Sequence, residues 1–318
     1  MIFIILGLFV VIIVSFITTL VVLTNKLYNY CFVKYDDVKM IKKIEYHRSL
    51  NSEAYQFREK LLSMDSEKLE IKSKDNNELI GYLFKQNVNN KKLIILVHGW
   101  HTDAFMNVSR FGKMYFEDQS FDILIVYNEA HYPSNGNIIG FGVNDSYNVI
   151  KWINHINEMY PNKYTIYLHG VSMGASSCLF SYKYQLPSNV MGIIVDSGFS
   201  NVHNQLKYSA QMRYGRNFNL VLKLIRNKIK RNLKYDIVSE NVLDIINNYN
   251  IPIMFIHGKE DLVVPVNMTI KMYESYKGPK KLLLVDGAGH IDACRVDPIK
   301  YKEEIYEFIN KNRGVQWI

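Results

Sequence analysis

The pentapeptide from Gly170 to Gly174, with Ser172 at its centre, is the segment that most restricts how this chain can fold. Residues 164–169 before it are rich in β-forming side chains, and residues 175–180 after it favour a helix. A strand that turns sharply into a helix at Gly-x-Ser-x-Gly lifts the serine hydroxyl above the carboxyl edge of a sheet. The glycines leave room for neighbouring backbone. We therefore expect a mostly parallel sheet with Ser172 at its edge as a candidate nucleophile.

A serine nucleophile needs a base, and the base needs an acid that orients it. Two apolar runs that predict buried strands end just before suitable side chains. Asp261 follows residues 251–257, and His290 follows residues 281–285. Together with Ser172 they stand in the order serine, acid, histidine that this kind of turn uses. Because each residue follows a strand, all three are expected at one edge of the sheet.

A further strand, predicted at residues 93–97, leads to Trp100 and supplies a candidate oxyanion hole. One donor would be the backbone N–H of Met173, the residue after the nucleophile, and the other the backbone N–H of Trp100. Backbone donors place no demand on the side chain, so Trp100 is also free to line a pocket. His131, on the loop after the next strand, is a candidate substrate contact.

These motifs together resemble the α/β-hydrolases, in particular bacterial membrane-tethered serine hydrolases similar to the serine aminopeptidase and cinnamoyl-esterase-like branch. The resemblance covers about residue 69 to the C-terminus. It implies a mostly parallel eight-stranded sheet with helices on both faces and a helical cap. Many relatives carry Asp-x-Arg-Gly-His-Gly where residues 128–134 stand here, and this departure bears on substrate choice. The motifs that carry the resemblance are His98 to Trp100, Gly170 to Gly174, Ile256 to Asp261 with Val264 and Pro265, and Gly287 to His290.

Asp196 is a rival for the acid, because it follows another predicted strand at residues 190–195 and some hydrolases take their acid from that strand. Its alternative role is that of a loop residue that bonds nearby backbone N–H groups. We favour Asp261, since the sequence around Asp261 matches the family motif.

The first residues have a different character from the rest of the chain. Residues 2–23 carry no charge and are long enough to cross a hydrocarbon core as a helix. They lack the basic start and the cleavage site of a signal peptide. We predict a transmembrane anchor in contact with membrane lipid at residues 1–24, a helical stalk at 25–66 and the hydrolase domain at 67–318. The membrane side stays open, because lysines after the span favour a cytoplasmic domain whereas the resemblance favours export.

The net charge of +8 is concentrated between residues 213 and 234. Apolar residues recur there every four positions from Val221 to Leu233, with basic residues between them, which predicts an amphipathic helix. We place it in a cap at about 199–249. The apolar cap residues Phe218 and Leu224 are candidates for lining an acyl pocket. The basic side is either solvated or in contact with anionic lipid headgroups.

The sequence contains no motif for the other kinds of chemistry considered. It has no His-Glu-x-x-His or Cys-x-x-Cys spacing for a metal, no phosphate-binding glycine loop for a cofactor, and no nucleic-acid-binding motif. Three cysteines without framework spacing predict no disulfides. We expect a cofactor-free serine hydrolase that cleaves an ester or thioester of a small or acyl substrate. The alternatives are a serine peptidase or amidase on short peptides and, in another class, a non-catalytic membrane-bound binding scaffold.

Overall fold

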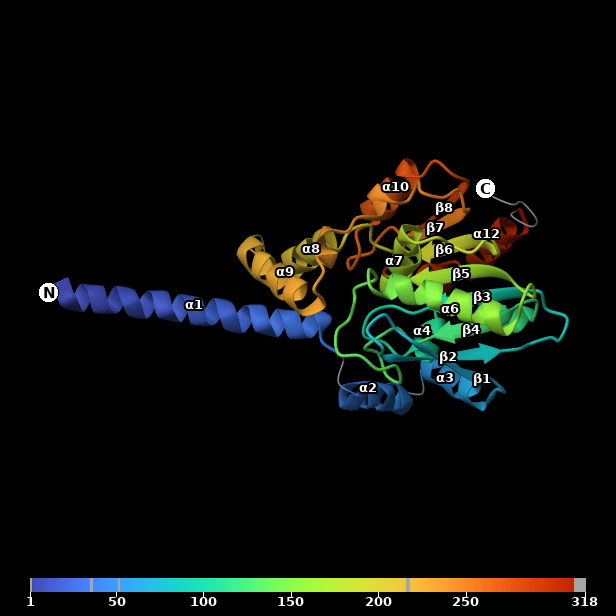
Figure 1. Cartoon of the computed structure of the whole chain (residues 1–318), viewed down its shortest axis with the longest axis horizontal. Helices are drawn as coiled ribbons and strands as arrows, with labels where there is room; N and C mark the ends of the chain where they lie inside the picture. Colours follow the sequence, from blue (N-terminus) through green and yellow to red (C-terminus); the bar gives the residue numbers. More distant parts are fainter. Residues whose placement is uncertain (1, 35–36, 51, 216–217, 312–318) are drawn as a thin grey trace.

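The computed structural model describes residues 2–34, 37–50, 52–215 and 218–311. At its centre lies an eight-stranded sheet with the strand order β1-β2-β4-β3-β5-β6-β7-β8 (Figure 1). Within the described chain only β2 runs against the other strands. The predicted fold class is therefore confirmed. The strands are β1 (Glu67–Lys72), β2 (Glu78–Phe84), β3 (Lys92–Val97), β4 (Asp122–Val126), β5 (Thr165–Val171), β6 (Val190–Asp196), β7 (Ile253–Gly258) and β8 (Lys280–Val285).

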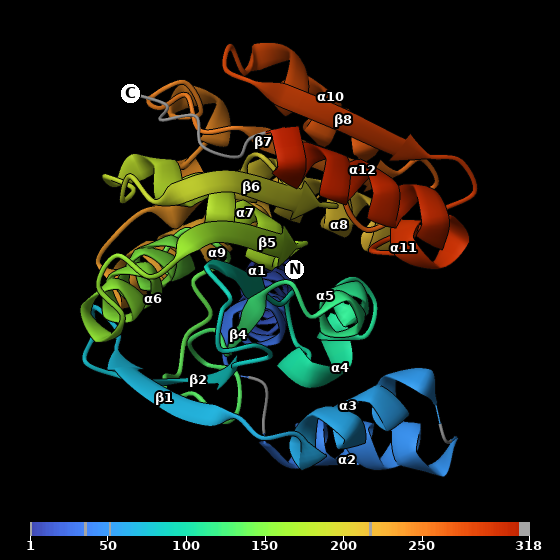
Figure 2. The same ribbon diagram turned by 90° about the vertical axis from the view of Figure 1, so that its right-hand side faces the viewer.

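Helices cover both faces of the sheet because the central strands are apolar on both sides (Figure 2). In β3, Ile95 and Val97 belong to one buried core, and Ile94 and Leu96 belong to the other. The first core is covered by α6 (Asp145–Met159), α7 (Met173–Phe180) and α10 (Val266–Ser275). The second is covered by α3 (Glu53–Ser63), α4 (Ala104–Val108), α5 (Lys113–Asp118), α11 (Ala293–Val296) and α12 (Pro298–Lys311).

The carboxyl ends of the parallel strands form one continuous edge. Register pairs Val97 of β3 with Gly170 of β5, and Asp196 of β6 with Ile256 of β7. The loops that follow these strands therefore converge, and in open α/β sheets ligand sites form at this edge.

A cap is inserted between β6 and β7. It contains α8 (Val202–Tyr214), α9 (Asn219–Leu233) and two short 3-10 turns, η2 (Ile237–Ser239) and η3 (Val242–Asp244). The amphipathic pattern predicted for α9 is present, since Val221, Ile225 and Ile229 are buried. Leu222 is buried beside them, and this apolar side packs towards α8 and helix α1.

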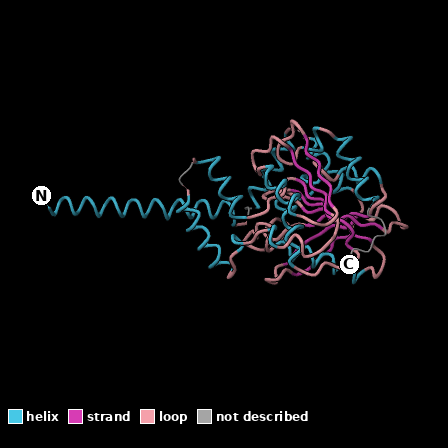
Figure 3. Tube along the Cα trace, turned by 90° about the horizontal axis from the view of Figure 1, so that it is seen from above, coloured by secondary structure: helices cyan, strands magenta, loops and turns pink. Residues whose placement is uncertain are grey.

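The N-terminal helix α1 (Ile2–Phe32) is long and apolar enough to cross a membrane, by length and composition. It projects from the body of the protein as a single rod (Figure 3). Its side chains are exposed through most of its length, whereas Thr24, Tyr28 and Phe32 are buried where the helix docks against α9. The anchor boundary predicted at residue 24 thus falls inside a continuous helix that ends within the folded body.

The predicted stalk contains the end of α1 and two further helices, α2 (Asp37–Ser49) and α3. Residues 35, 36 and 51 of that segment lie outside the described chain. α3 packs against α4, and its Phe57 and Leu61 are part of the second core. The helices that the sequence indicates therefore lie on the body of the protein that contains the sheet.

Candidate active site

Ser172 lies at the junction of β5 and α7 in a backbone conformation that L residues rarely adopt, with φ 52° and ψ −119°. Its N–H donates to the carbonyl oxygen of Asp196 over 2.8 Å. A Cβ atom on Gly170 would lie 2.3 Å from the carbonyl oxygen of Gly174, and one on Gly174 would lie 2.2 Å from that of Val97. Only glycine fits at these two positions, and the packing they allow holds the strained turn that presents the hydroxyl.

The three side chains singled out in the sequence come together beyond the ends of β5, β7 and β8. His290 Nε2 lies 2.9 Å from Ser172 Oγ, and His290 Nδ1 lies 2.7 Å from Asp261 Oδ2. An ionised carboxylate only accepts hydrogen bonds, so Nδ1 carries the proton that it donates to Asp261. The same imidazole then presents an unprotonated Nε2 to the hydroxyl of Ser172.

The carboxylate of Asp261 is fixed on both of its oxygens. Oδ1 accepts the backbone N–H groups of Val263, over 2.8 Å, and Val264, over 2.9 Å. Oδ2 lies 3.1 Å from His257 Nε2 as well as facing His290. Burial on its own would raise the pKa of Asp261, but the hydrogen bonds from His257 and His290 outweigh it and hold the pKa well below its usual range. Asp261 is therefore ionised at neutral pH.

His257, at the end of β7, is fully buried and belongs to the same network. Its Nε2 faces two acceptors, Asp261 Oδ2 at 3.1 Å and the carbonyl oxygen of Val264 at 3.0 Å, so this nitrogen carries the proton. Its Nδ1 lies 2.7 Å from Thr269 Oγ1, whose hydroxyl donates to it. No motif in the sequence predicts the contact between His257 and Asp261. The four-residue spacing between the two was the available signal.

The carboxylate of Asp196, the alternative candidate for the acid, bonds to other groups than His290. Its Oδ1 accepts the hydroxyl of Ser197 over 2.8 Å, and its Oδ2 accepts that of Tyr301 over 3.1 Å. Burial raises the pKa of Asp196. These bonds tie the carboxylate to α12, and the carboxylate within hydrogen-bond distance of His290 is that of Asp261.

The loop after β3 lies beside Ser172, since a Cβ atom on Gly99 would lie 3.4 Å from Ser172 Cβ. His98 Nε2 accepts the N–H of Asn128 over 3.0 Å, so His98 Nδ1 is protonated and donates to the carbonyl oxygen of Gly99 over 2.7 Å. In a trans peptide the C=O and N–H point in opposite directions. The N–H of Trp100 therefore points away from the buried ring of His98.

Side chains below the loop accept hydrogen bonds from two of its backbone N–H groups. The N–H of Gly99 donates to Asn107 Oδ1 over 2.9 Å, and the N–H of His101 donates to His131 Nε2 over 3.1 Å. His131 Nδ1 donates to the carbonyl oxygen of Glu129 over 3.0 Å. Burial lowers the pKa of His131 to about 4, so the ring is neutral. The structure places His131 under this loop with both ring nitrogens engaged, and not in a substrate pocket as predicted.

Met173 opens α7, so its N–H belongs to the first turn and has no carbonyl partner within the helix. The positive end of the helix also favours negative charge at this point. The N–H groups of Met173 and Trp100 thus lie on the two segments that flank Ser172, where an oxyanion hole requires its donors.

The N-terminal helices brace the same loop from outside. The indole Nε1–H of Trp100 donates to the carbonyl oxygen of Cys31 over 3.0 Å, and the ring of Tyr30 meets the indole edge-on, with 5.2 Å between centroids. Lys43 Nζ donates to the carbonyl oxygen of His101 over 3.1 Å, and burial lowers the pKa of Lys43. No motif in the sequence signals these contacts, because their partners are 58 and 69 positions apart.

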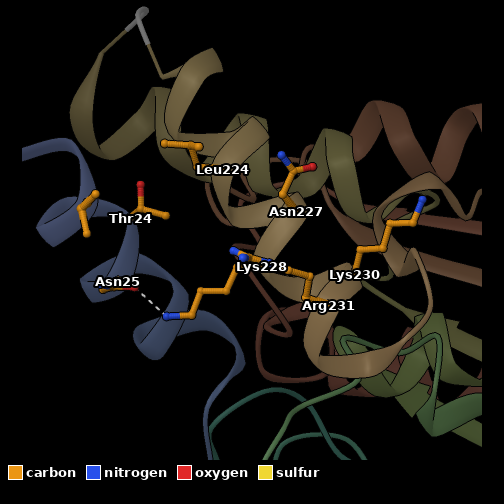
Figure 4. Close-up of a pocket in the computed structure, with 8 residues that line it drawn as sticks. Thr24, Asn25, Leu224, Asn227, Lys228, Lys230 and Arg231 are labelled. Carbon is orange, nitrogen blue, oxygen red and sulfur yellow. Dashed lines mark hydrogen bonds between the residues drawn. The ribbon is translucent and has the colours of Figure 1, made fainter. Parts of the chain in front are cut away.

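The cap reaches the site through α8 and not through the two residues predicted from the sequence. Leu224 lines a groove between α1 and α9 whose lining does not include Ser172, Asp261 or His290 (Figure 4), because the apolar side of α9 is used to cover α1. Phe218 stacks on Tyr214 between α8 and α9, with 5.0 Å between ring centroids. The side chain that contacts the acid loop is Gln205, whose Nε2 donates to the carbonyl oxygen of Val263 over 2.8 Å.

Comparison with known proteins finds relatives by sequence and solved structures with the same fold. No family model matches the sequence. The chain is 25% identical to the uncharacterised protein YqkD of Bacillus subtilis over 217 residues, which span 68% of this chain and 70% of YqkD. The esterase Pf2001 of Pyrococcus furiosus superposes with a TM-score of 0.63 and 22% identity over 80% of this chain and 95% of that one. An acylaminoacyl peptidase of Pyrococcus horikoshii gives 0.56 and 16% over 79% of this chain and 42% of that one.

The sheet order, the strand–turn–helix at Ser172 and these likenesses define the class: the chain has the α/β-hydrolase fold. Among the described residues no three His, Cys, Asp or Glu side chains gather as a metal site would require. What this member of the fold does follows from its site, since many activities share the fold.

Proposed function

We propose that this protein is a membrane-anchored serine hydrolase that cleaves an ester or thioester through an acyl-enzyme. The observation that carries the proposal is the unbroken hydrogen-bonded chain from Ser172 Oγ through His290 to Asp261, with distances of 2.9 Å and 2.7 Å. A nucleophile, its base and an orienting acid in this order are what acyl transfer needs.

The mechanism follows from the protonation states. Ser172 Oγ attacks the carbonyl carbon while His290 Nε2 takes its proton. Asp261 stabilises the imidazolium that results and remains ionised. The N–H groups of Met173 and Trp100 donate to the oxyanion of the tetrahedral intermediate. His290 then returns the proton to the leaving group, and a water molecule, activated by the same histidine, releases the acyl group.

An ester is the first choice of substrate, and an amide of a short peptide is the second. The solved structures that share the fold include both an esterase and an acylaminoacyl peptidase, so the fold occurs in enzymes named for ester cleavage and in enzymes named for peptide cleavage. Ester cleavage is favoured because it makes fewer demands on the site: its leaving group departs with less help from the general acid than an amine does.

The anchoring part of the proposal rests on α1. None of the side chains in its apolar window is buried, which is costly in water and expected in a lipid core. Through α1 the catalytic domain is tethered at a membrane surface.

The test is covalent labelling together with turnover. Wild-type protein should react with a fluorophosphonate and hydrolyse chromogenic esters of increasing acyl length faster than aminoacyl amides. Ser172→Ala should lose both properties and keep its fold, as judged by circular dichroism. Labelling that persists in Ser172→Ala would move the nucleophile elsewhere. A folded wild type that is neither labelled nor active would favour the non-catalytic scaffold, and faster amide cleavage would favour the peptidase. Separately, the full-length chain should sediment with membranes.

A further inference from the structure

The cap has an unusual charge distribution for its size. Residues 197–235 contain no Asp or Glu, and they contain more basic residues than the net charge of +8 of the whole chain. The basic residues of this segment are Lys207, Arg213, Arg216, Lys223, Arg226, Lys228, Lys230, Arg231 and Lys234. Such a segment attracts anions as a whole, and the structure shows where its cations are free to bind one.

Five of these nine basic residues lie on α9, which packs against α1. Arg226 is already used, since it pairs with Asp236 over 2.7 Å. Among the described residues Lys228 contacts neutral groups, the Oδ1 of Asn25 at 2.6 Å and the face of the Tyr28 ring at 4.4 Å. Arg231 forms no ion pair or hydrogen bond with the described residues. Two cations beside α1 therefore lack an anionic partner.

These two cations line a groove of about 610 Å³ between the helices (Figure 4). From α1 the groove is lined by Val21, Thr24 and Asn25, and from α9 by Leu224, Asn227, Lys228, Lys230 and Arg231. In Figure 4 Lys230 extends away from α1, whereas Lys228 reaches towards it. The groove thus has cationic and amide groups beside two aliphatic side chains, Val21 and Leu224.

The groove also contains a buried polar atom without a partner. Thr24 is 7% exposed, and its Oγ1 forms no hydrogen bond within the described part of the chain. A buried hydroxyl without a partner carries a desolvation cost, so such a group in a native structure points to a missing partner. A hydroxyl, an amide and two cations are donors of the kind that bind a phosphate group.

The position of the groove along α1 indicates where that phosphate comes from. The run of exposed large hydrophobic side chains begins at Ile2 and ends at Val22, and the first buried residue is Thr24. At 1.5 Å per residue this run is about 30 Å long, the thickness of a bilayer's hydrocarbon core. A bilayer that covers the run therefore places its headgroups at the level of Thr24, Lys228 and Arg231.

The corner between α8 and α9 has the composition of an interfacial contact. Met212, Tyr214 and Leu220 are exposed there, at 56%, 47% and 49%. Large apolar and aromatic side chains beside cations are typical of protein surfaces that lie at a membrane interface. Figure 1 shows α8 and α9 lying along the part of α1 that is nearest the sheet.

We propose that the groove between α1 and α9 binds the headgroup of an anionic phospholipid in the leaflet that α1 enters. Arg231 and Lys228 contact the phosphate, the Thr24 hydroxyl donates to one of its oxygens, and the acyl chains leave past Val21 and Leu224. The bound lipid joins the cap to the anchor and sets the height of the catalytic domain above the bilayer. This inference rests on the anchoring part of the proposed function and not on its chemistry.

The test uses the full-length chain in detergent and measures lipid binding by native mass spectrometry. Phosphatidylglycerol should bind as a single copy and more tightly than phosphatidylcholine. The variant Lys228→Ala/Arg231→Ala should bind phosphatidylglycerol about 25-fold more weakly, at about fivefold per cation near a lipid surface. Thr24→Val, which keeps the shape of the side chain, should also weaken it. The matched control Lys207→Ala/Lys223→Ala removes the same charge outside the groove and should leave binding unchanged.

Each result bears on the proposal. Equal binding of the two lipids, or an equal loss in the control variant, would overturn it in favour of diffuse attraction. Displacement of phosphatidylglycerol by glycerol 1-phosphate at matched concentration would show a site for soluble phosphates and would also overturn it. Fluorophosphonate labelling of the same samples, and membrane sedimentation of the same variants before detergent is added, keep these failures apart from a failure of the proposed function.

Discussion

Replacing the acid of the proposed triad by its amide tests the site most sharply, because the structure determines which way the amide must face. In Asp261→Asn the position of Oδ1 receives the N–H groups of Val263 and Val264, so only the amide oxygen fits there. The NH₂ group is then forced to the position of Oδ2, which lies 2.7 Å from His290 Nδ1.

An NH₂ group donates, and therefore His290 Nδ1 must become the acceptor and its proton must move to Nε2. A protonated Nε2 at 2.9 Å from Ser172 Oγ cannot take the proton of the hydroxyl. The corresponding change in other triads lowers kcat by about 10⁴, which is about 5.5 kcal/mol of transition-state stabilisation. We expect a loss of that size in ester hydrolysis by Asp261→Asn.

Asp196→Asn is the matched control, since it makes the same chemical change at the rival acid. Its two partners, Ser197 and Tyr301, are hydroxyls that both donate and accept, so they can adapt to an amide. We expect a loss of less than about tenfold. The measurement is kcat for a short chromogenic ester and the rate of fluorophosphonate labelling, with thermal unfolding to show that both variants are folded. A larger loss in Asp196→Asn than in Asp261→Asn would refute the assignment of the acid.

Two further predictions concern the oxyanion loop and a buried carboxyl group. Trp100→Phe removes the indole N–H that bonds Cys31, and because one hydrogen bond is worth about 1 kcal/mol, kcat should fall about fivefold with KM unchanged. An unchanged kcat in steady-state kinetics would show that this bond does not position the loop. Burial raises the pKa of Asp145 from 3.8 to about 7, so the folded state keeps a proton that the unfolded chain loses between these values, and stability should fall as pH rises through that window. Asp145→Asn should remove this slope and raise the free energy of unfolding at pH 8 by up to about 4 kcal/mol, and urea unfolding that shows the same pH slope in both proteins would contradict it.

The sequence predicted those parts of the site that depend on local geometry. The turn at Ser172 is specified by glycines two positions away, and these are the glycines whose Cβ atoms would clash. The choice between Asp196 and Asp261 was harder, because both follow strands at the same edge of the sheet. Only the surroundings of each carboxylate separate them, and Tyr301, which holds Asp196, lies 105 positions away.

The cap illustrates a second limit on what a sequence pattern can predict. Periodicity identified the apolar side of α9 but not what that side would cover. Leu224 was predicted to line an acyl pocket, whereas it faces the groove beside α1. An amphipathic pattern shows that a surface will be buried, and the partner that buries it depends on tertiary structure.

The boundary predicted at residue 24 falls inside α1 for a related physical reason. Composition changes from apolar to polar near residue 24, but helix propensity does not change there, so α1 continues to Phe32 and docks its last turns on the folded body. That extension brings the carbonyl oxygen of Cys31 to the indole of Trp100, while Lys43 holds the carbonyl oxygen of His101. A hydrolase domain that starts at residue 67 would lack both contacts. The loop that carries a candidate oxyanion donor is thus braced by the last turn of α1 and by α2, so the apolar helix and the candidate active site are structurally connected.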